Sequence, residues 1–335
     1  MKRRKKVGLA LGSGASRGWS HLGIIKALQE NNIPIDYVAG TSIGAYVGAI
    51  FASGHFENFL KIVLDMDWKK VISFLDPSVS FSGLLEGKKV MDLAEEVMGV
   101  KIFEELKTPL CVVAANLKTG EEIIFSKGPL REAIHASIAV PGIIRPVKIN
   151  NIICVDGGIL NPVPVNVVRE MGADIVIAVD LNRCLVGTKK KNMKKTKAEE
   201  VRDNTLNTAI YKKFFDRFTP LESFFQSLLK SSNNNEKKEK DGIPGFREVY
   251  HTSIDIIERQ IARLNLSLYP PDILIMPDLG YLKFFDFDKG EEIIQEGYNK
   301  AMQQMEHIKH LVYAPGFPFF SDFFSSNKKL AKKAL

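Results

Sequence analysis

Two short apolar runs open the chain, and each leads through a glycine-rich turn into a helical pattern. The first run is VGLAL at residues 7–11, after which apolar positions recur at helical spacing. The second is IDYVA at 35–39, followed by a turn at 40–44 and another apolar helix. Short apolar runs bounded by turns predict buried strands. The first 55 residues therefore indicate a strand–turn–helix unit, twice.

The same alternation continues along the chain. Apolar runs predict further strands at 110–115, 121–125, 152–155, 174–180 and 272–276. Amphipathic spacing predicts helices at 86–98, 129–137, 162–171, 246–265 and 288–309. Alternating buried strands and amphipathic helices build sheets that are covered on both faces. We therefore expect an α/β fold, a three-layer α/β/α sandwich with a mainly parallel central sheet.

One long segment breaks this alternation. Residues 186–245 are Lys-rich and then Asn-rich. Such polar composition is typical of an insertion with a mobile loop, which we expect near 231–242. We expect a core at 1–185 that continues in the same domain at 246–312, after the insertion. An aromatic and basic tail at 313–335 would follow.

Positive charge gathers in the insertion. The 335 residues carry a net charge of +7, and residues 188–241 hold 14 Lys and Arg against 8 Asp and Glu. Basic clusters attract the phosphates of nucleic acids or anionic lipids. The sequence has no zinc-finger spacing or RNA-binding aromatic motif, whereas phenylalanines crowd residues 214–230 and 317–324. Phenylalanines beside basic residues are typical of an element that contacts a lipid surface. A helix that packs its phenylalanines into the protein's own core fits the same pattern equally well. We expect a membrane surface, and no nucleic acid, as partner.

The cysteines and the lengths of the apolar segments indicate where in the cell the protein resides. Cys111, Cys154 and Cys184 form no C-x-x-C pair, so we expect neither a disulfide framework nor a structural zinc site. Residues 37–56 are uncharged, but their four glycines and three Ser or Thr favour a turn and a buried helix over a membrane span. The basic start lacks the long apolar core of a signal peptide. We expect a cytoplasmic protein with peripheral contact to the inner membrane face.

The segment Gly40-Thr41-Ser42-Ile43-Gly44 has the G-x-S-x-G pattern of a nucleophile elbow. It lies between a predicted strand and a predicted helix, as that motif requires. Glycine relieves crowding in so tight a turn, and the helix N-terminus favours negative charge developing on the serine. A plain strand–helix turn can carry the same pattern.

A second glycine-rich turn precedes the first helix. In residues 12–18 (GSGASRG), small side chains allow backbone N–H groups to form a nest for an oxyanion or a phosphate. A dinucleotide site needs G-x-G-x-x-G and an acidic residue that closes the second strand. Here the third glycine comes one residue late, and Asp36 opens its strand.

The third piece is Asp156-Gly157-Gly158, directly after the apolar run at 152–155. By itself it indicates a turn. Open α/β sheets place their sites at the carboxyl ends of strands, and a carboxylate within hydrogen-bond reach of a serine hydroxyl can act as its base. The three pieces could therefore form one site without a histidine.

Together these motifs resemble the patatin-like phospholipase family, and most closely its bacterial branch akin to neuropathy target esterase. LALGSGASRGWSHLGIIKAL resembles the glycine-rich oxyanion segment of the family and GTSIGA its serine elbow. VDGGILNPVPV resembles its aspartate motif, and HASIAVPGIIRPV the stretch before that motif. The resemblance covers residues 7 to about 182 and returns at MPDLGYLKFFDFDKGEEIIQEGYNKA.

The resemblance implies a serine lipid acyl hydrolase that acts on phospholipid or lysophospholipid through an acyl-enzyme, without metal or cofactor. Ser42 would be the nucleophile and Asp156 its base. The oxyanion loop would comprise Gly14, Ala15, Ser16, Arg17 and Gly18, with donors around the first three and Arg17 fixing the loop. Many relatives have three successive glycines, whereas this chain has Gly-Ser-Gly-Ala, and Ala resists positive φ.

Three alternatives remain at this point. A histidine triad in the order Ser, Asp, His could use His251, His307 or His310. The glycine-rich turn could serve a nucleotide-binding oxidoreductase. The same fold could also be a catalytically idle membrane adaptor. The oligomeric state and the preferred head group are not predicted.

Overall fold

The computed structural model describes residues 4–78, 83–182 and 246–313. Its strands are β1 (Val7–Leu11), β2 (Tyr37–Thr41), β3 (Gly83–Leu85), β4 (Leu110–Asn116), β5 (Glu122–Phe125), β6 (Gly142–Ile144), β7 (Val147–Ile149), β8 (Ile152–Asp156), β9 (Ile175–Val179) and β10 (Ile273–Ile275). Eight of them form one sheet in the order β10-β9-β1-β2-β4-β8-β7, with β5 paired to β4, and β3 pairs β6 apart from it.

Helices connect and cover these strands. The described α-helices are α1 (Ser20–Glu30), α2 (Ile43–Ser53), α3 (Phe56–Leu64), α4 (Trp68–Phe74), α5 (Lys88–Met98), α6 (Leu130–Ser137), α7 (Val165–Glu170), α10 (Phe246–Leu268), α11 (Gly290–Gln303) and α12 (Met305–Tyr313). Short 3-10 turns occur at η1 (Ala15–Trp19), η2 (Phe103–Glu105) and η3 (Gly157–Ile159).

The sheet is mixed but mainly parallel. Strands β10, β9, β1, β2 and β4 run parallel to one another. Strands β5 and β8 are antiparallel to β4, and β7 is antiparallel to β8. The expected α/β class with a mainly parallel central sheet is therefore confirmed.

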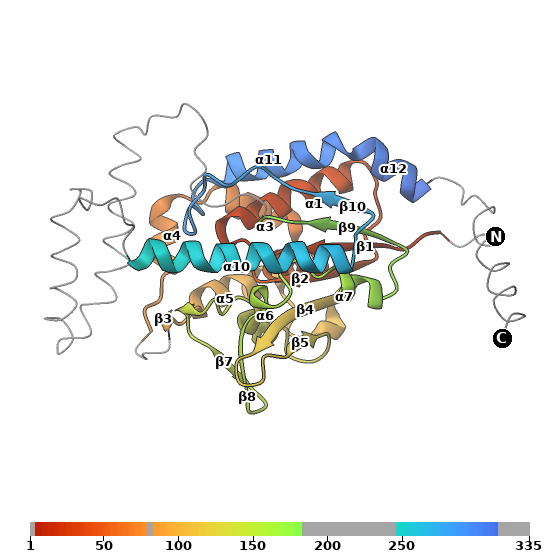
Figure 1. Cartoon of the computed structure of the whole chain (residues 1–335). Coiled ribbons are helices and arrows are strands. Elements are labelled where there is room, and N and C mark those ends of the chain that lie inside the picture. Colours follow the sequence, from red (N-terminus) through yellow and green to blue (C-terminus); the bar gives the residue numbers. More distant parts are fainter. Residues whose placement is uncertain (1–3, 79–82, 183–245, 314–335) are drawn as a thin grey trace, which may run out of the picture.

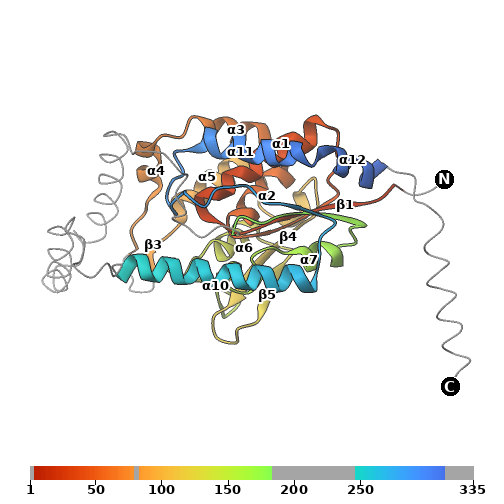
Figure 2. The same ribbon diagram turned by 45° about the horizontal axis from the view of Figure 1, so that its top comes forward.

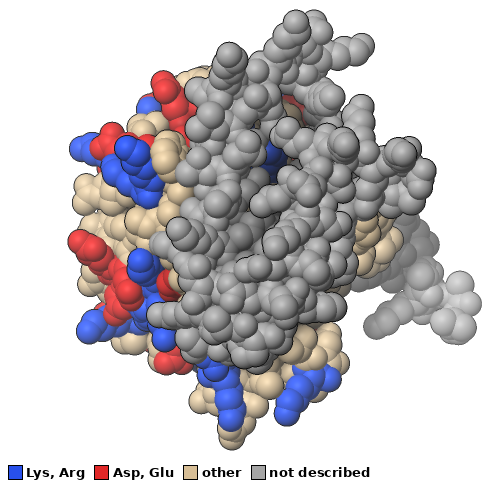
Figure 3. All heavy atoms as spheres, turned by 90° about the vertical axis from the view of Figure 1, so that its left-hand side faces the viewer, with Lys and Arg blue, Asp and Glu red and all other residues tan. Residues whose placement is uncertain are grey.

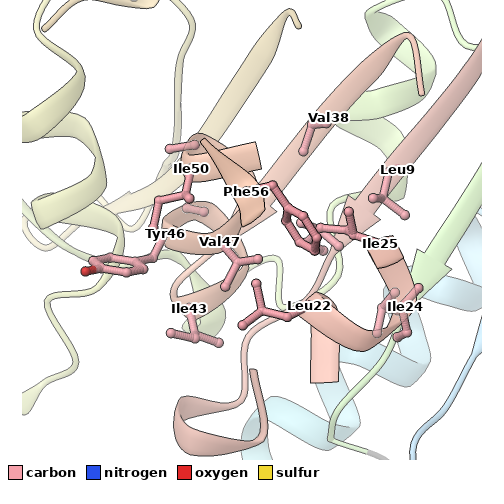
Figure 4. Packing of buried hydrophobic residues seen from close by; sticks show 14 of the residues in the cluster. Leu9, Leu22, Ile24, Ile25, Val38, Ile43, Tyr46, Val47, Ile50 and Phe56 are labelled. Atoms are coloured by element: carbon pink, nitrogen blue, oxygen red, sulfur yellow. The ribbon is translucent and has the colours of Figure 1, made fainter. Parts of the chain in front are cut away.

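The alternation of side chains along β1 separates two helical layers. Leu9 and Leu11 point into a large apolar cluster with α1, α2, α3 and α11, whereas Ala10 points into a second cluster with α7 and α10. Successive residues of a strand face opposite sides of a sheet. Figures 1 and 2 show α1 and α11 on one side of the strands and α7 and α10 on the other. In Figure 4, Ile25 of α1 lies near Leu9 of β1, and Leu22 of α1 lies near Val47 of α2.

Several boundaries differ from the sequence-based expectation. The second strand begins two residues later than predicted and continues to Thr41, so the first residue after the strand is Ser42. The helix expected at 288–309 is two helices, because α11 ends at Gln303 and α12 begins at Met305. The helices α3 and α4 and the three-residue strands β3, β6 and β7 were not predicted.

The apolar stretch 37–56 is a strand followed by a short helix. Helix α2 has 11 residues and ends at Ser53, and the next residue, Gly54, has φ 86°. Among the described residues, no helix combines the length and the hydropathy that crossing a bilayer requires. The insertion predicted at 186–245, the Phe-rich runs at 214–230 and 317–324, and Cys184 lie outside the described residues.

Candidate active site

Ser42 occupies a strained turn between β2 and α2. Its φ of 58° and ψ of −126° place a non-glycine residue in a sparsely populated region, which is typical of functional sites that the surrounding structure holds in place. Its N–H donates to the Ser137 hydroxyl at 2.9 Å, and its carbonyl accepts from the N–H of Ala45 at 2.9 Å. The neighbouring Thr41 hydroxyl donates to the Asn161 carbonyl at 2.8 Å. The turn therefore projects the serine from the carboxyl end of a buried strand.

The elbow glycines are required by close packing. A Cβ on Gly44 would lie 2.1 Å from the Leu11 carbonyl oxygen, and one on Gly40 would lie 2.4 Å from the Gly44 carbonyl oxygen. Real Cβ atoms do not come so close to backbone oxygen. A Cβ on Gly18 would lie 2.2 Å from Cγ1 of Ile43, so η1 packs directly on the first turn of α2.

Asp156 ends β8 and meets the serine side chain. The Ser42 hydroxyl donates to Oδ2 of Asp156, and the Gly158 N–H donates to Oδ1 at 2.8 Å. The aspartate is 2% exposed. Burial raises its pKa to about 7, although both hydrogen bonds lower it. A carboxyl group that titrates near neutral pH is suited to take a proton from a serine hydroxyl and return it.

The glycine-rich loop keeps two N–H groups free within the described residues. The N–H of Ser13 donates to the Pro162 carbonyl at 2.8 Å, and that of Ser16 to the Phe284 carbonyl at 3.3 Å. No described group accepts a hydrogen bond from the N–H of Gly14 or Ala15. The three donors expected from sequence thus reduce to two, because Ser16 is engaged elsewhere. Ala15 has φ 50°, the left-handed conformation that its methyl group disfavours.

Arg17 braces this loop from inside. It is 6% exposed, and its Nε donates to the Gly14 carbonyl at 3.1 Å. Its Nη2 donates to Oδ1 of Asn182 at 3.3 Å and lies 3.6 Å from Oδ1 of Asp255. Arg17 therefore connects the backbone of the loop to residues after β9 and on α10.

His21 also contacts the loop. Its Nε2 lies 2.8 Å from the Gly12 carbonyl oxygen. Burial lowers the pKa of His21 to about 4, although the hydrogen bond to Gly12 raises it. The ring is therefore neutral at pH 7 and donates from Nε2. It holds the backbone just before the two free donors.

Within the described part of the chain, no hydrogen bond joins another histidine to Ser42. His307 and His310 are exposed on α12. The side chain of His251 lies outside the described residues. The recorded partner of the serine hydroxyl is the aspartate.

Asp36, the acidic residue that a dinucleotide site would need, lies at the opposite end of the sheet from the glycine-rich turn. It accepts hydrogen bonds from the Val7 N–H at 2.9 Å and from Lys6 at 3.0 Å. It also forms an ion pair with Arg4 at 2.5 Å. Its partners thus lie at the amino end of β1, whereas the turn follows the carboxyl end. Among the described residues, no group of three or more His, Cys, Asp or Glu is placed to hold a metal ion.

Three supporting residues escaped sequence reasoning. Ser137 accepts a hydrogen bond from the Ser42 N–H and donates one to the Val113 carbonyl at 2.6 Å. It lies in the HASIAVPGIIRPV segment, to which the sequence alone assigns no role. Asn161 lies within the VDGGILNPVPV segment, and its amide donates to Glu122 at 2.7 Å. Glu258 of α10 accepts from the Ser13 hydroxyl at 3.3 Å. No local pattern marks a lone glutamate on a helix as part of a site.

Similarity to known proteins extends over most of the chain. Residues 9–169 match the family model described as patatin-like phospholipase. An uncharacterized NTE family protein of Mycobacterium tuberculosis is 32% identical over 329 residues, which cover 90% of this chain and 91% of that protein. Lysophospholipase NTE1 of Pyricularia oryzae is 25% identical over 313 residues, and the match covers 91% of this chain but 19% of that protein.

A solved structure was also matched. VipD from Legionella pneumophila aligns with a TM-score of 0.45 at 14% identity, covering 91% of this chain and 67% of that chain. The family match includes both the elbow serine and the aspartate that meets it. The chain belongs to the patatin-like phospholipase family of lipid ester hydrolases.

Proposed function

We propose that this protein is a phospholipase or lysophospholipase that works through a Ser42–Asp156 dyad and an acyl-enzyme intermediate. The observation that carries the proposal is the hydrogen bond from the serine hydroxyl to a buried carboxyl group. The names of the fungal lysophospholipases, which are 25% and 27% identical to this chain, support the substrate class. The catalytic unit would comprise residues 1–185 and 246–312.

The geometry fits acyl transfer in two half-reactions. In the first, Oγ of Ser42 attacks the ester carbonyl carbon while Asp156 takes the hydroxyl proton. The negative charge on the tetrahedral oxygen is stabilised by the N–H groups of Gly14 and Ala15. The ester C–O bond then breaks, and the leaving alcohol takes the proton from Asp156.

Hydrolysis of the acyl-enzyme reverses these roles. A water molecule attacks the acyl carbon and gives a proton to Asp156. Collapse of the second tetrahedral intermediate releases the fatty acid and returns the proton to Oγ of Ser42. Neither half-reaction requires a metal or a diffusible cofactor.

Contact with a lipid surface forms part of the same proposal, and α10 is the described element that suits it. Five large apolar side chains on its outer face are between 42% and 71% exposed: Val249, Ile256, Ile257, Leu264 and Leu268. The residues between them on that face are Ser253, Gln260, Arg263 and Ser267, without a carboxylate. An apolar face with a basic residue and no acid suits a lipid interface. Figure 3 shows Lys or Arg interspersed with Asp or Glu along the described rim of another face.

Binding to phospholipid vesicles tests this surface. The double variant Ile256→Ser, Leu264→Ser should bind vesicles more weakly than the wild type while hydrolysing a soluble short-chain ester at the same rate. Leu117→Ser is the matched control, because Leu117 is 54% exposed on another part of the molecule. Equal vesicle binding by the double variant and the control would exclude α10 as the contact.

The activity itself is tested by offering phospholipid, lysophospholipid and triacylglycerol in parallel to the wild type and to Ser42→Ala. We expect release of fatty acid from the first two substrates, and none with the variant. A fluorophosphonate probe should label the wild type at Ser42. Absence of both labelling and hydrolysis would favour an idle adaptor, and saturable binding of NADH would favour the oxidoreductase.

A further inference from the structure

The inner face of α10 contacts the segments that form the proposed site. Figures 1 and 2 show this helix running along one face of the sheet. Asn265 donates to the Leu160 carbonyl at 2.9 Å, just after η3. Nearly three helical turns earlier, Asp255 lies 3.6 Å from the Arg17 guanidinium. The helix is therefore tied to both the aspartate motif and the glycine-rich loop.

Glu258 lies between these two anchors, and its carboxyl group bridges the same two segments. Its Oε2 accepts from the Ser13 hydroxyl at 3.3 Å, and that hydroxyl accepts from the Asn182 amide at 3.0 Å. Its Oε1 faces η3: a Cβ placed on Gly158 would lie 3.1 Å from this oxygen and 3.1 Å from Oδ1 of Asp156. The two carboxyl oxygens are thus separated by no more than twice that distance.

The charge around Glu258 is unbalanced. Asp156 faces it from β8, Asp255 from the same helix, and Arg17 from η1. Arg17 pairs with Asp255, and no described cation forms an ion pair with Glu258. Three carboxyl groups and the Arg17 guanidinium therefore lie close together. Burial, and then the charge of Asp156, raise the pKa of Glu258 to about 8, although Arg17 lowers it.

We propose that Glu258, neutral and hydrogen-bonded to Ser13, is a positioning residue that holds the glycine-rich loop in place and keeps a second negative charge away from Asp156 and the developing oxyanion. The inference rests on the proposed function, because it assigns the role within that reaction. Ser13 precedes Gly14, one of the two free donors. An ionised Glu258 would add negative charge beside the loop that must stabilise an oxyanion, and the rate would fall.

The test compares kcat/KM between pH 5 and 10 on a soluble short-chain ester for the wild type, Glu258→Gln and Glu258→Ala. Glu132→Gln is the matched control, since Glu132 is exposed on α6. The wild type and the control should lose activity above about pH 8. Glu258→Gln should match the wild type up to pH 7 and exceed it roughly tenfold or more at pH 9.5, because an amide cannot ionise. Glu258→Ala should be slower than Glu258→Gln at every pH, since alanine cannot form a hydrogen bond to Ser13.

Two results would overturn the role of Glu258. One is an alkaline loss in Glu258→Gln with the same midpoint as in the wild type. The other is a folded Glu258→Gln that is inactive at all pH values, which would make the carboxyl group itself essential. Failure of the proposed function looks different, because the wild type would then be no more active than Ser42→Ala. Thermal stability, measured in the Ser42→Ala background, reports on the carboxyl group without catalysis. Because the unfolded glutamate ionises above about pH 4.5 whereas the folded one stays neutral to about pH 8, Glu258→Gln should leave Tm unchanged at pH 4 and raise it progressively up to about pH 8. An unchanged Tm at both pH 4 and pH 8.5 would contradict a neutral Glu258.

Discussion

Replacing Asp156 by Asn should abolish most activity and at the same time stabilise the fold at alkaline pH. The structure holds this carboxyl group 2% exposed, and burial raises its pKa from 3.8 to about 7. The unfolded chain releases the proton near pH 4, whereas the folded chain retains it to about pH 7. Stability therefore falls as pH rises between these values, and the full penalty is present above pH 7.

The size of the effect follows from the pKa difference. About three pH units correspond to roughly 4 kcal/mol of folding free energy, which is an upper value. Asn keeps a carbonyl oxygen for the Gly158 N–H and an amide beside the Ser42 hydroxyl, so the hydrogen bonds remain possible. Loss of the general base should lower kcat by about 10²–10⁴-fold. The variant would thus be more stable and nearly inactive.

The assay pairs urea or thermal unfolding at pH 5 and pH 8.5 with ester hydrolysis. Asp156→Asn should gain several degrees in Tm over the wild type at pH 8.5 and far less at pH 5. Ser42→Ala is the control for inactivity, because it leaves the buried carboxyl group in place and should show no such gain. An equal change at both pH values would refute the buried-charge explanation, and hydrolysis at the wild-type rate would refute the base.

Three further changes test other parts of the structure. Ala15→Gly should keep activity and add up to about 1 kcal/mol of stability, since φ 50° then carries no steric strain; a clear loss of stability in urea unfolding would contradict this. Gly44→Ala should reduce soluble expression and remove activity, because its Cβ would lie 2.1 Å from the Leu11 carbonyl oxygen; a normal Tm would show that the loop yields. Asp36→Asn should lower the free energy of unfolding by about 1–2 kcal/mol at pH 7 and leave it unchanged near pH 2. Burial raises the pKa of Asp36, but hydrogen bonds from Arg4 and its neighbours lower this pKa to about 2. A loss of stability that is independent of pH would point to packing instead.

The local sequence pattern determines many of the strands and turns of this protein. Apolar runs such as 7–11 and 110–115 are strands because buried parallel strands are apolar on both faces. The G-x-S-x-G segment marks the turn at Ser42, since it combines small residues with a strand before it and a helix after it. The helix α3 also carries a readable signal, with Phe56, Phe59 and Val63 on one buried face.

Tertiary structure decided what the pattern could not. The hydroxyl of Ser42 and the carboxyl of Asp156 are 114 positions apart in sequence, and they meet because β2 and β8 both pair with β4. Which N–H groups stay free depends on carbonyls at Pro162 and Phe284, far along the chain. Burial raises the pKa of Asp156, and the packing of α10 brings Glu258 close to the glycine-rich loop. Both depend on everything packed around these residues. Sequence spacing encodes local geometry, whereas proximity and desolvation are properties of the folded chain.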